Sequence, residues 1–163
     1  MPIYHTLGKI PHKRHTVFKN GKDRFFYEQL FGTIGFDGMS SLLYHVHRPT
    51  QVSRIVGSRD VQPKIALEKN MRSLRLHGFN GAPVADHLEA RKPILVNSDC
   101  AIILAAPTAP KVEYFYKNAD CDEMIFIHKG TGKLRTFLGT IEFAYGDYLV
   151  IPRAIIHRLV PGA

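Results

Sequence analysis

The feature that most constrains this fold is a series of short strand-like segments separated by glycine and proline. Segments 41–47, 101–107 and 148–152 are β-branched or aromatic, or alternate between apolar and polar residues, as strands do. The sequence HKGTGK at 128–133 predicts a hairpin turn. Short strands at this spacing predict an all-β, mainly antiparallel fold, either a sandwich or a barrel.

The same criteria predict further strands at 71–77, 112–117, 123–130 and 133–139. One segment, 64–76, has two possible structures. Its first half contains good helix formers, whereas its second half alternates, so helix and strand both stay open there.

Length and composition predict one soluble domain. The 163 residues are 45% hydrophobic and contain no repeat or low-complexity linker. The longest apolar run, 101–107, is far shorter than the roughly 20 residues needed to cross a bilayer, and no signal segment follows Met1. Two cysteines, Cys100 and Cys121, are too few for a disulfide framework and predict free thiols. We therefore expect a cytoplasmic protein without a membrane partner.

The net charge of +8, from 22 basic and 14 acidic residues, favours anions of any kind. The densest basic stretch, HKRH at 12–15, lacks the interleaved aromatic side chains of a single-strand nucleic-acid groove. A solvated loop is the expected structure, and nucleic acid is not an expected partner.

Two intervals in the second half match the two motifs of the cupin barrel. Six residues lead from Glu123 to Gly130, and five residues lead from Gly146 to Pro152, with His157 after four more. A metal-binding cupin supplies a His-x-His pair and a glutamate from its first motif and another histidine from its second.

Here the positions of the His-x-His pair hold Tyr116 and Asn118. A neutral phenol and an amide are poor ligands for a divalent transition metal. Glu123 and His157 are therefore only weak candidate metal ligands, and we expect a packed barrel without bound metal.

Two other groups of residues are candidates for cation binding. His45 and His47 alternate along a predicted strand and could chelate one metal, although a solvent-exposed face explains them equally well. The sequence NADCDE at 118–123 gathers three carboxylates around Cys121, but a hydrated turn is the simpler interpretation.

Four stretches together resemble the N-terminal half of bacterial homogentisate 1,2-dioxygenases, namely MPIYHTLGKIPHKRHTVF, FYEQLFGTIGFDGMSSLLYHVHRPTQV, YFYKNADCDEMIFIHKGTGKL and YGDYLVIPR. The resemblance extends over essentially the whole chain. YEQLFGTIGFDG and NADCDE are distinctive of that family, whereas GDYLVIP is common to cupins.

This resemblance implies an Fe(II)-dependent enzyme that opens the ring of homogentisate with O2 to give maleylacetoacetate, in tyrosine and phenylalanine breakdown. Members of the family are bicupins, and the iron is held by two histidines and a glutamate in the C-terminal half. None of those ligands has a counterpart here. The resemblance implies that residues 1–163 form one cupin-like domain, with an N-terminal β extension (1–92) packed on a barrel or jelly roll (93–163).

On this interpretation the chain has no catalytic or cofactor-binding residues of its own. Its partners are the absent C-terminal catalytic cupin and further copies of the chain, with 27–36 as a subunit contact. The substrate of the whole enzyme is a small aromatic acid. The alternative is a self-sufficient small cupin that either depends on a metal or is a metal-free binding module.

Overall fold

The computed structural model describes residues 18–19, 21, 24–35, 37–49, 51–66, 72–108 and 112–162. The chain divides into two compact units, Met1–Ser58 and Arg59–Ala163, and each is described by itself. The basic stretch 12–15 lies outside the described residues. The predicted division of one domain at residue 92 remains a prediction.

The first unit contains a hairpin of β1 (Tyr27–Ile34) and β2 (Asp37–His45). The strands are antiparallel, and Leu30 lies opposite Leu42. Gly35 connects them with a φ of 63°, which glycine adopts without the steric penalty of other residues. The side chains of Leu30 and Leu42 are half exposed, so this face of the hairpin is open and apolar.

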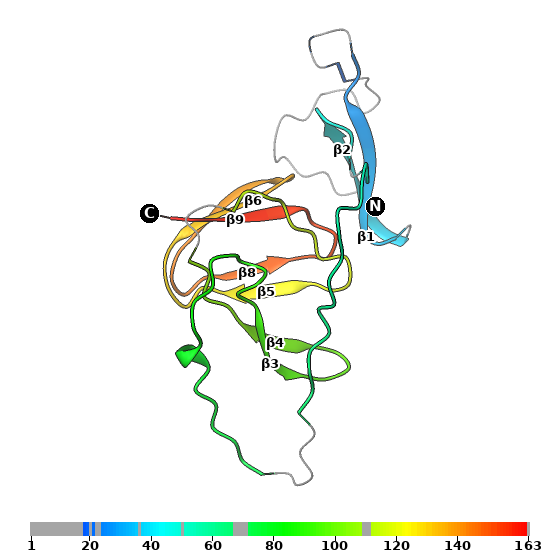
Figure 1. Cartoon of the computed structure of the whole chain (residues 1–163). Coiled ribbons are helices and arrows are strands. Elements are labelled where there is room, and N and C mark those ends of the chain that lie inside the picture. Colours follow the sequence, from blue (N-terminus) through cyan, green and yellow to red (C-terminus); the bar gives the residue numbers. More distant parts are fainter. Residues whose placement is uncertain are drawn as a thin grey trace. The chain divides into compact units, whose positions relative to one another are not determined.

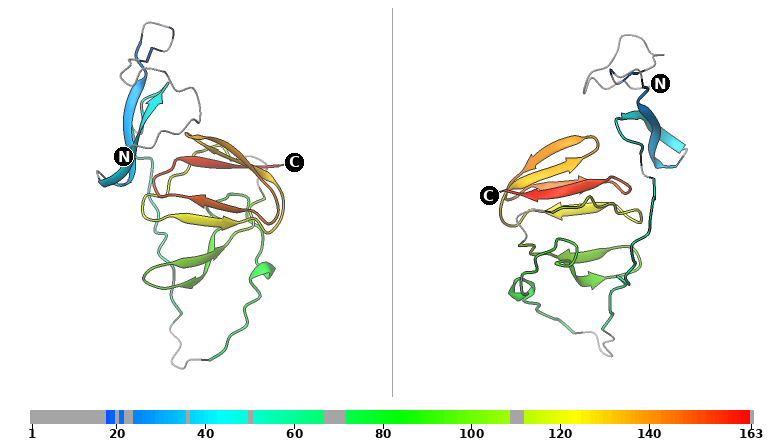
Figure 2. Two further views of the ribbon diagram at one scale, coloured as in Figure 1. Left: turned by 180° about the vertical axis from the view of Figure 1, so that it is seen from behind. Right: turned by 45° about the horizontal axis from the view of Figure 1, so that its top comes forward.

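The described residues of the second unit contain a short 3-10 helix, η1 (Gly78–Asn80), and seven strands (Figure 1). The strands are β3 (Lys92–Val96), β4 (Ala101–Leu104), β5 (Glu123–Phe126), β6 (Gly132–Thr136), β7 (Gly139–Phe143), β8 (Tyr148–Ile151) and β9 (His157–Pro161). They form the antiparallel pairs β3–β4 and β5–β8 and a three-stranded sheet in the order β7-β6-β9. The views of Figures 1 and 2 place β5–β8 between the other two sheets.

The core of the second unit follows from the two-residue period of its strands. Along β8, Leu149 and Ile151 are buried while Tyr148 and Val150 are exposed. Glu123 lies opposite Ile151 on β5, and this register places its carboxylate on the inner face of the β5–β8 pair. The buried apolar side chains are Ala90, Val112, Ile127, Leu134, Leu149, Ile151 and Ile155. The candidate site therefore lies beside the core.

The structure confirms the all-β, antiparallel class. It shows three local errors in the sequence-based prediction. Segment 128–133 is not a hairpin turn, because β5 pairs with β8 and β6 pairs with β7 and β9. Segment 112–117 forms only an isolated bridge at Tyr116. The described part of 71–77 contains no strand, since its alternating side chains have no partner strand.

Within segment 64–76, residues 64–66 and 72–76 are neither helix nor strand, and 67–71 lie outside the described residues. No helix among the described residues is long and apolar enough to span a membrane.

Candidate functional site

The four positions that the sequence analysis compared with cupin motifs lie together in the second unit. Tyr116 and His157 form a reciprocal backbone pair, in which the amide of each donates to the carbonyl of the other at 2.8 and 2.9 Å. Their rings meet edge to face, with centroids 5.4 Å apart. Asn118 follows two residues after Tyr116, and its side-chain amide donates to Glu123 Oε1 at 2.9 Å. The expected convergence of Glu123 and His157 is therefore present.

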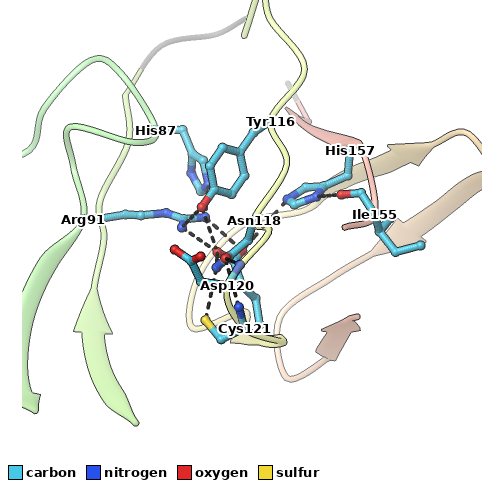
Figure 3. Close-up of polar contacts among 9 residues, drawn as sticks. His87, Arg91, Tyr116, Asn118, Asp120, Cys121, Ile155 and His157 are labelled. Carbon is cyan, nitrogen blue, oxygen red and sulfur yellow. Dashed lines mark hydrogen bonds and ion pairs between the residues drawn. The ribbon is translucent and has the colours of Figure 1, made fainter. Parts of the chain in front are cut away.

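A single turn at 86–90 brings two further side chains to this point. The Asp86 carboxylate accepts hydrogen bonds from the backbone amides of Leu88 and Glu89, as a helix N-cap does. The amide of Ala90 then donates to the Asp86 carbonyl at 2.9 Å. Residues four apart on such a turn lie on one side. His87 and Arg91 consequently reach the site together (Figure 3).

Arg91 is the centre of the site. Its guanidinium donates to both oxygens of Glu123, from Nη1 to Oε1 at 2.7 Å and from Nη2 to Oε2 at 3.1 Å. It also lies over the Tyr116 ring, 4.8 Å from the centroid. The Arg91 and Glu123 side chains are 19% and 11% exposed, so this paired geometry is far less screened than a surface ion pair.

The hydrogen bonds of His87 define its protonation state. Arg91 Nη2 lies 3.2 Å from His87 Nε2, and a guanidinium can only donate. His87 Nε2 therefore carries a lone pair, and the ring is neutral with its proton on Nδ1. Burial, reinforced by the positive charge of Arg91, lowers the pKa of His87 from 6.5 to about 4. The ring stays neutral at physiological pH.

His157 has one satisfied and one unsatisfied ring nitrogen. Its Nδ1 lies 3.0 Å from the Ile155 carbonyl oxygen, which can only accept, so Nδ1 bears the proton. Its Nε2 points toward the carboxylate, 4.0 Å from Glu123 Oε2. The side chain is 2% exposed, and Nε2 has no hydrogen-bond partner among the described residues. A buried polar atom without a hydrogen-bond partner is uncommon in folded proteins and destabilises the folded state.

Opposing effects set the charge of Glu123. Burial favours the neutral acid, but hydrogen bonds from Arg91 and Asn118 and the charge of Arg91 outweigh it, so the pKa of Glu123 lies below its usual value of 4.5. Burial acts to lower the pKa of Arg91, but the hydrogen bonds and the negative charge of Glu123 raise that pKa overall. Both groups are ionised near neutrality, and the site contains one balanced ion pair.

These residues do not fit an iron ion in their present arrangement. Among the described residues, no group of three His, Cys, Asp or Glu side chains is placed to hold a metal. Both oxygens of Glu123 are engaged by Arg91. Tyr116 donates its hydroxyl proton to Glu123 Oε1 at 3.3 Å, and its pKa is raised chiefly by burial, so it stays a neutral phenol. A resident cation, the guanidinium, already neutralises the carboxylate.

The other candidate residues lie elsewhere. His45 ends β2 in the first unit, and its Nε2 is 2.8 Å from Gln29 Oε1. His47 follows the strand and is exposed, so the two histidines do not share one strand face as predicted. The stretch 118–123 is a turn in which Asn118 Oδ1 accepts from the amides of Asp120 and Cys121. Cys100 and Cys121 are free, as predicted, and both are exposed.

The sequence analysis missed His87 and Arg91. A local signal was present, because Asp86 and Glu89 have the spacing of a capping box and His87 and Arg91 are four residues apart. Nothing local indicates that this turn faces Glu123, 32 residues away. That contact depends on the tertiary fold.

The chain is similar to a curated protein of Saccharolobus solfataricus named "Putative dioxygenase SSO1533". The two are 34% identical over 160 residues, which is 98% of this chain and 41% of the relative. The chain thus spans about two fifths of the length of that protein. No protein-family model matches the chain, and no solved structure matches it.

Proposed function

We propose that this chain is the N-terminal, noncatalytic portion of a homogentisate 1,2-dioxygenase, with a cupin-like fold that supports an iron-carrying catalytic cupin. The observation that carries the proposal is the Arg91–Glu123 pair. The glutamate at the metal-ligand position of the motif is held through both oxygens by a guanidinium. The similarity to a relative named as a putative dioxygenase, over 41% of its length, supports the dioxygenase part of this proposal.

The chemistry of the residues explains why this portion would not catalyse ring cleavage. A two-histidine, one-carboxylate iron site needs open positions where substrate and O2 bind together. Here the carboxylate is neutralised by Arg91, and Tyr116 and Asn118 occupy the places of two imidazoles. Iron and the aromatic acid substrate would both bind in the catalytic portion of the whole enzyme.

The exposed apolar surface supports a role in association. The outer face of β5–β8 presents Met124 and Val150, 71% and 67% exposed, as a facing pair. Ile102 on β4 and Phe115 are each 56% exposed. A partner that covered these side chains would remove apolar surface from water. We propose that the catalytic cupin and other copies of the chain cover it, with β1–β2 as a subunit contact.

The test of the noncatalytic role is iron retention. The purified chain is loaded with Fe(II) without oxygen, excess metal is removed, and retained iron and O2 consumption with homogentisate are measured. We expect substoichiometric iron and no ring cleavage. Stoichiometric iron that is lost on His157→Ala, together with ring cleavage, would overturn the proposal and favour the self-sufficient metal-dependent cupin.

The whole-enzyme part of the proposal has a separate test. Sequencing the coding region downstream of Ala163 should reveal a second cupin with a His, Glu, His set. A stop codon directly after Ala163 would favour the alternative of a small self-sufficient cupin.

A further inference from the structure

Two arginines lie side by side on the outer face of the sheet β7-β6-β9. Arg135 on β6 is directly opposite Arg158 on β9, and residues in this register share one face of a sheet. Leu134, the neighbour of Arg135, is buried while Arg135 is exposed, so both arginines lie on the face that points away from the core. Directly opposed side chains have Cβ atoms roughly 4.5–5.5 Å apart. Both guanidinium groups can therefore reach one bound ion.

In the described sheet, no carboxylate balances these two charges. The residue opposite Arg135 on the third strand, β7, is Thr140. Lys133 is the contrast, because it lies two residues earlier on β6, opposite Glu142, and forms an ion pair with it at 2.8 Å. Among the described residues, neither arginine of the opposed pair forms an ion pair with a carboxylate. Like charges directly opposite each other destabilise a sheet, so a bound anion would be stabilising here.

Arg158 also has unused hydrogen-bonding capacity. Its Nη1 donates to the Val112 carbonyl at 3.4 Å, beyond the usual range for such a bond. Its Nε is buried and has no hydrogen-bond partner among the described residues. A guanidinium can only donate, so this observation does not depend on a choice of protonation state. An unsatisfied donor on a charged group is unfavourable, and an anion bound beside the guanidinium offers the acceptor oxygens that the protein lacks.

An aromatic ring positions the guanidinium of Arg158. The bridge between Tyr116 and His157 places Phe115 beside Arg158, because these two residues directly precede and follow the bridged pair. The Arg158 guanidinium lies over the Phe115 ring, 5.0 Å from the centroid. This cation–π contact holds the charge near the sheet without neutralising it. The positive charge of the opposed pair is therefore available to a ligand.

We propose that Arg135 and Arg158 form a binding site for a phosphate group. The charges decide between the common oxyanions. A phosphate monoester carries about −1.5 to −2 near neutral pH and balances two guanidinium groups, whereas a carboxylate would leave about one positive charge uncompensated. Arginine also binds phosphate through paired N–H donors. The net charge of +8 raises the local concentration of such anions. This inference does not depend on the proposed dioxygenase function.

Titration calorimetry of the chain in low-salt buffer compares phenyl phosphate, inorganic phosphate and benzoate. Phenyl phosphate and benzoate share the ring and differ in charge, and inorganic phosphate tests whether free phosphate suffices. We expect one equivalent of phenyl phosphate or inorganic phosphate to bind at least about fivefold more tightly than benzoate, with an affinity that falls as salt is added. The tighter of the two phosphates identifies the source of the group. Equal affinity for all three probes would overturn the proposal, as would no binding of either phosphate.

Matched substitutions locate the site. Arg135→Gln and Arg158→Gln should each lower the affinity for phosphate about tenfold, because each removes a charged hydrogen-bond donor. The control Lys133→Gln removes an equal charge from the same face of β6, but this lysine is already paired with Glu142, so affinity should change less than about twofold. Equal losses in Lys133→Gln and Arg135→Gln would indicate attraction by net charge alone and would overturn the proposal. Because Arg135 is exposed, Arg135→Gln tests the site even if Arg158→Gln does not fold.

Discussion

Protonation of His87 should make this protein less stable in mild acid. The folded pKa of about 4 lies below the ordinary value of 6.5. Between these values the unfolded chain binds a proton that the folded chain excludes, so stability falls as pH falls. Linkage with these two pKa values gives a loss of about 2 kcal/mol between pH 7 and pH 5. Glu123, with a folded pKa below 4.5, contributes mainly at lower pH.

Urea unfolding of wild type and His87→Gln at pH 7 and pH 5 measures this effect. Glutamine can still accept from Arg91 but does not titrate in this range. We expect wild type to lose about 2 kcal/mol on acidification and the variant less than about 0.5 kcal/mol. Equal losses in both proteins would refute the buried, neutral state of His87.

Two further predictions concern packing and association. Gly132→Ala should lower the free energy of unfolding by roughly 1–3 kcal/mol, because the added Cβ would lie 2.5 Å from the carbonyl oxygen of Val160. The control Gly57→Ala, whose Cβ would meet no atom within 4 Å, should leave it unchanged. Urea unfolding measures both. Leu30→Asp, on the exposed apolar face of β1–β2, should weaken self-association in sedimentation equilibrium. The control Thr140→Asp, at an exposed position of β7, should leave self-association unchanged. Equal association in both variants would count against the proposed contact.

The fold class was predictable because strand signals are local. The burial of each strand face depends on which residues alternate along that strand, whatever strand it pairs with. This holds for 148–152 and for the aromatic and β-branched residues of 123–126. Pairing is not local. The glycine-containing turn at 128–133 indicated a hairpin, but β5 pairs with β8, whose register with β5 brings Ile151 beside Glu123.

Only part of the candidate site could be predicted from the sequence. Glu123 and His157, the two residues that the intervals singled out, do lie together, with His157 Nε2 4.0 Å from Glu123 Oε2. The guanidinium that pairs with Glu123 could not be predicted, since Arg91 comes from a turn that precedes β3 and is far away in sequence. The apolar alternation at 71–77 likewise suggested a strand that the described residues do not form.

The central claim is that the guanidinium of Arg91 neutralises the buried carboxylate of Glu123 through a paired contact. A double-mutant cycle of Arg91→Ala and Glu123→Gln, measured by urea unfolding at pH 7 with a chelator, tests it directly. Each single substitution should cost roughly 3 kcal/mol, because it leaves one charge of a buried pair uncompensated. The double variant should cost about 3–4 kcal/mol in place of the additive sum of about 6 kcal/mol, which is a coupling energy of about 2–3 kcal/mol. Costs that add to within about 0.5 kcal/mol would contradict the account.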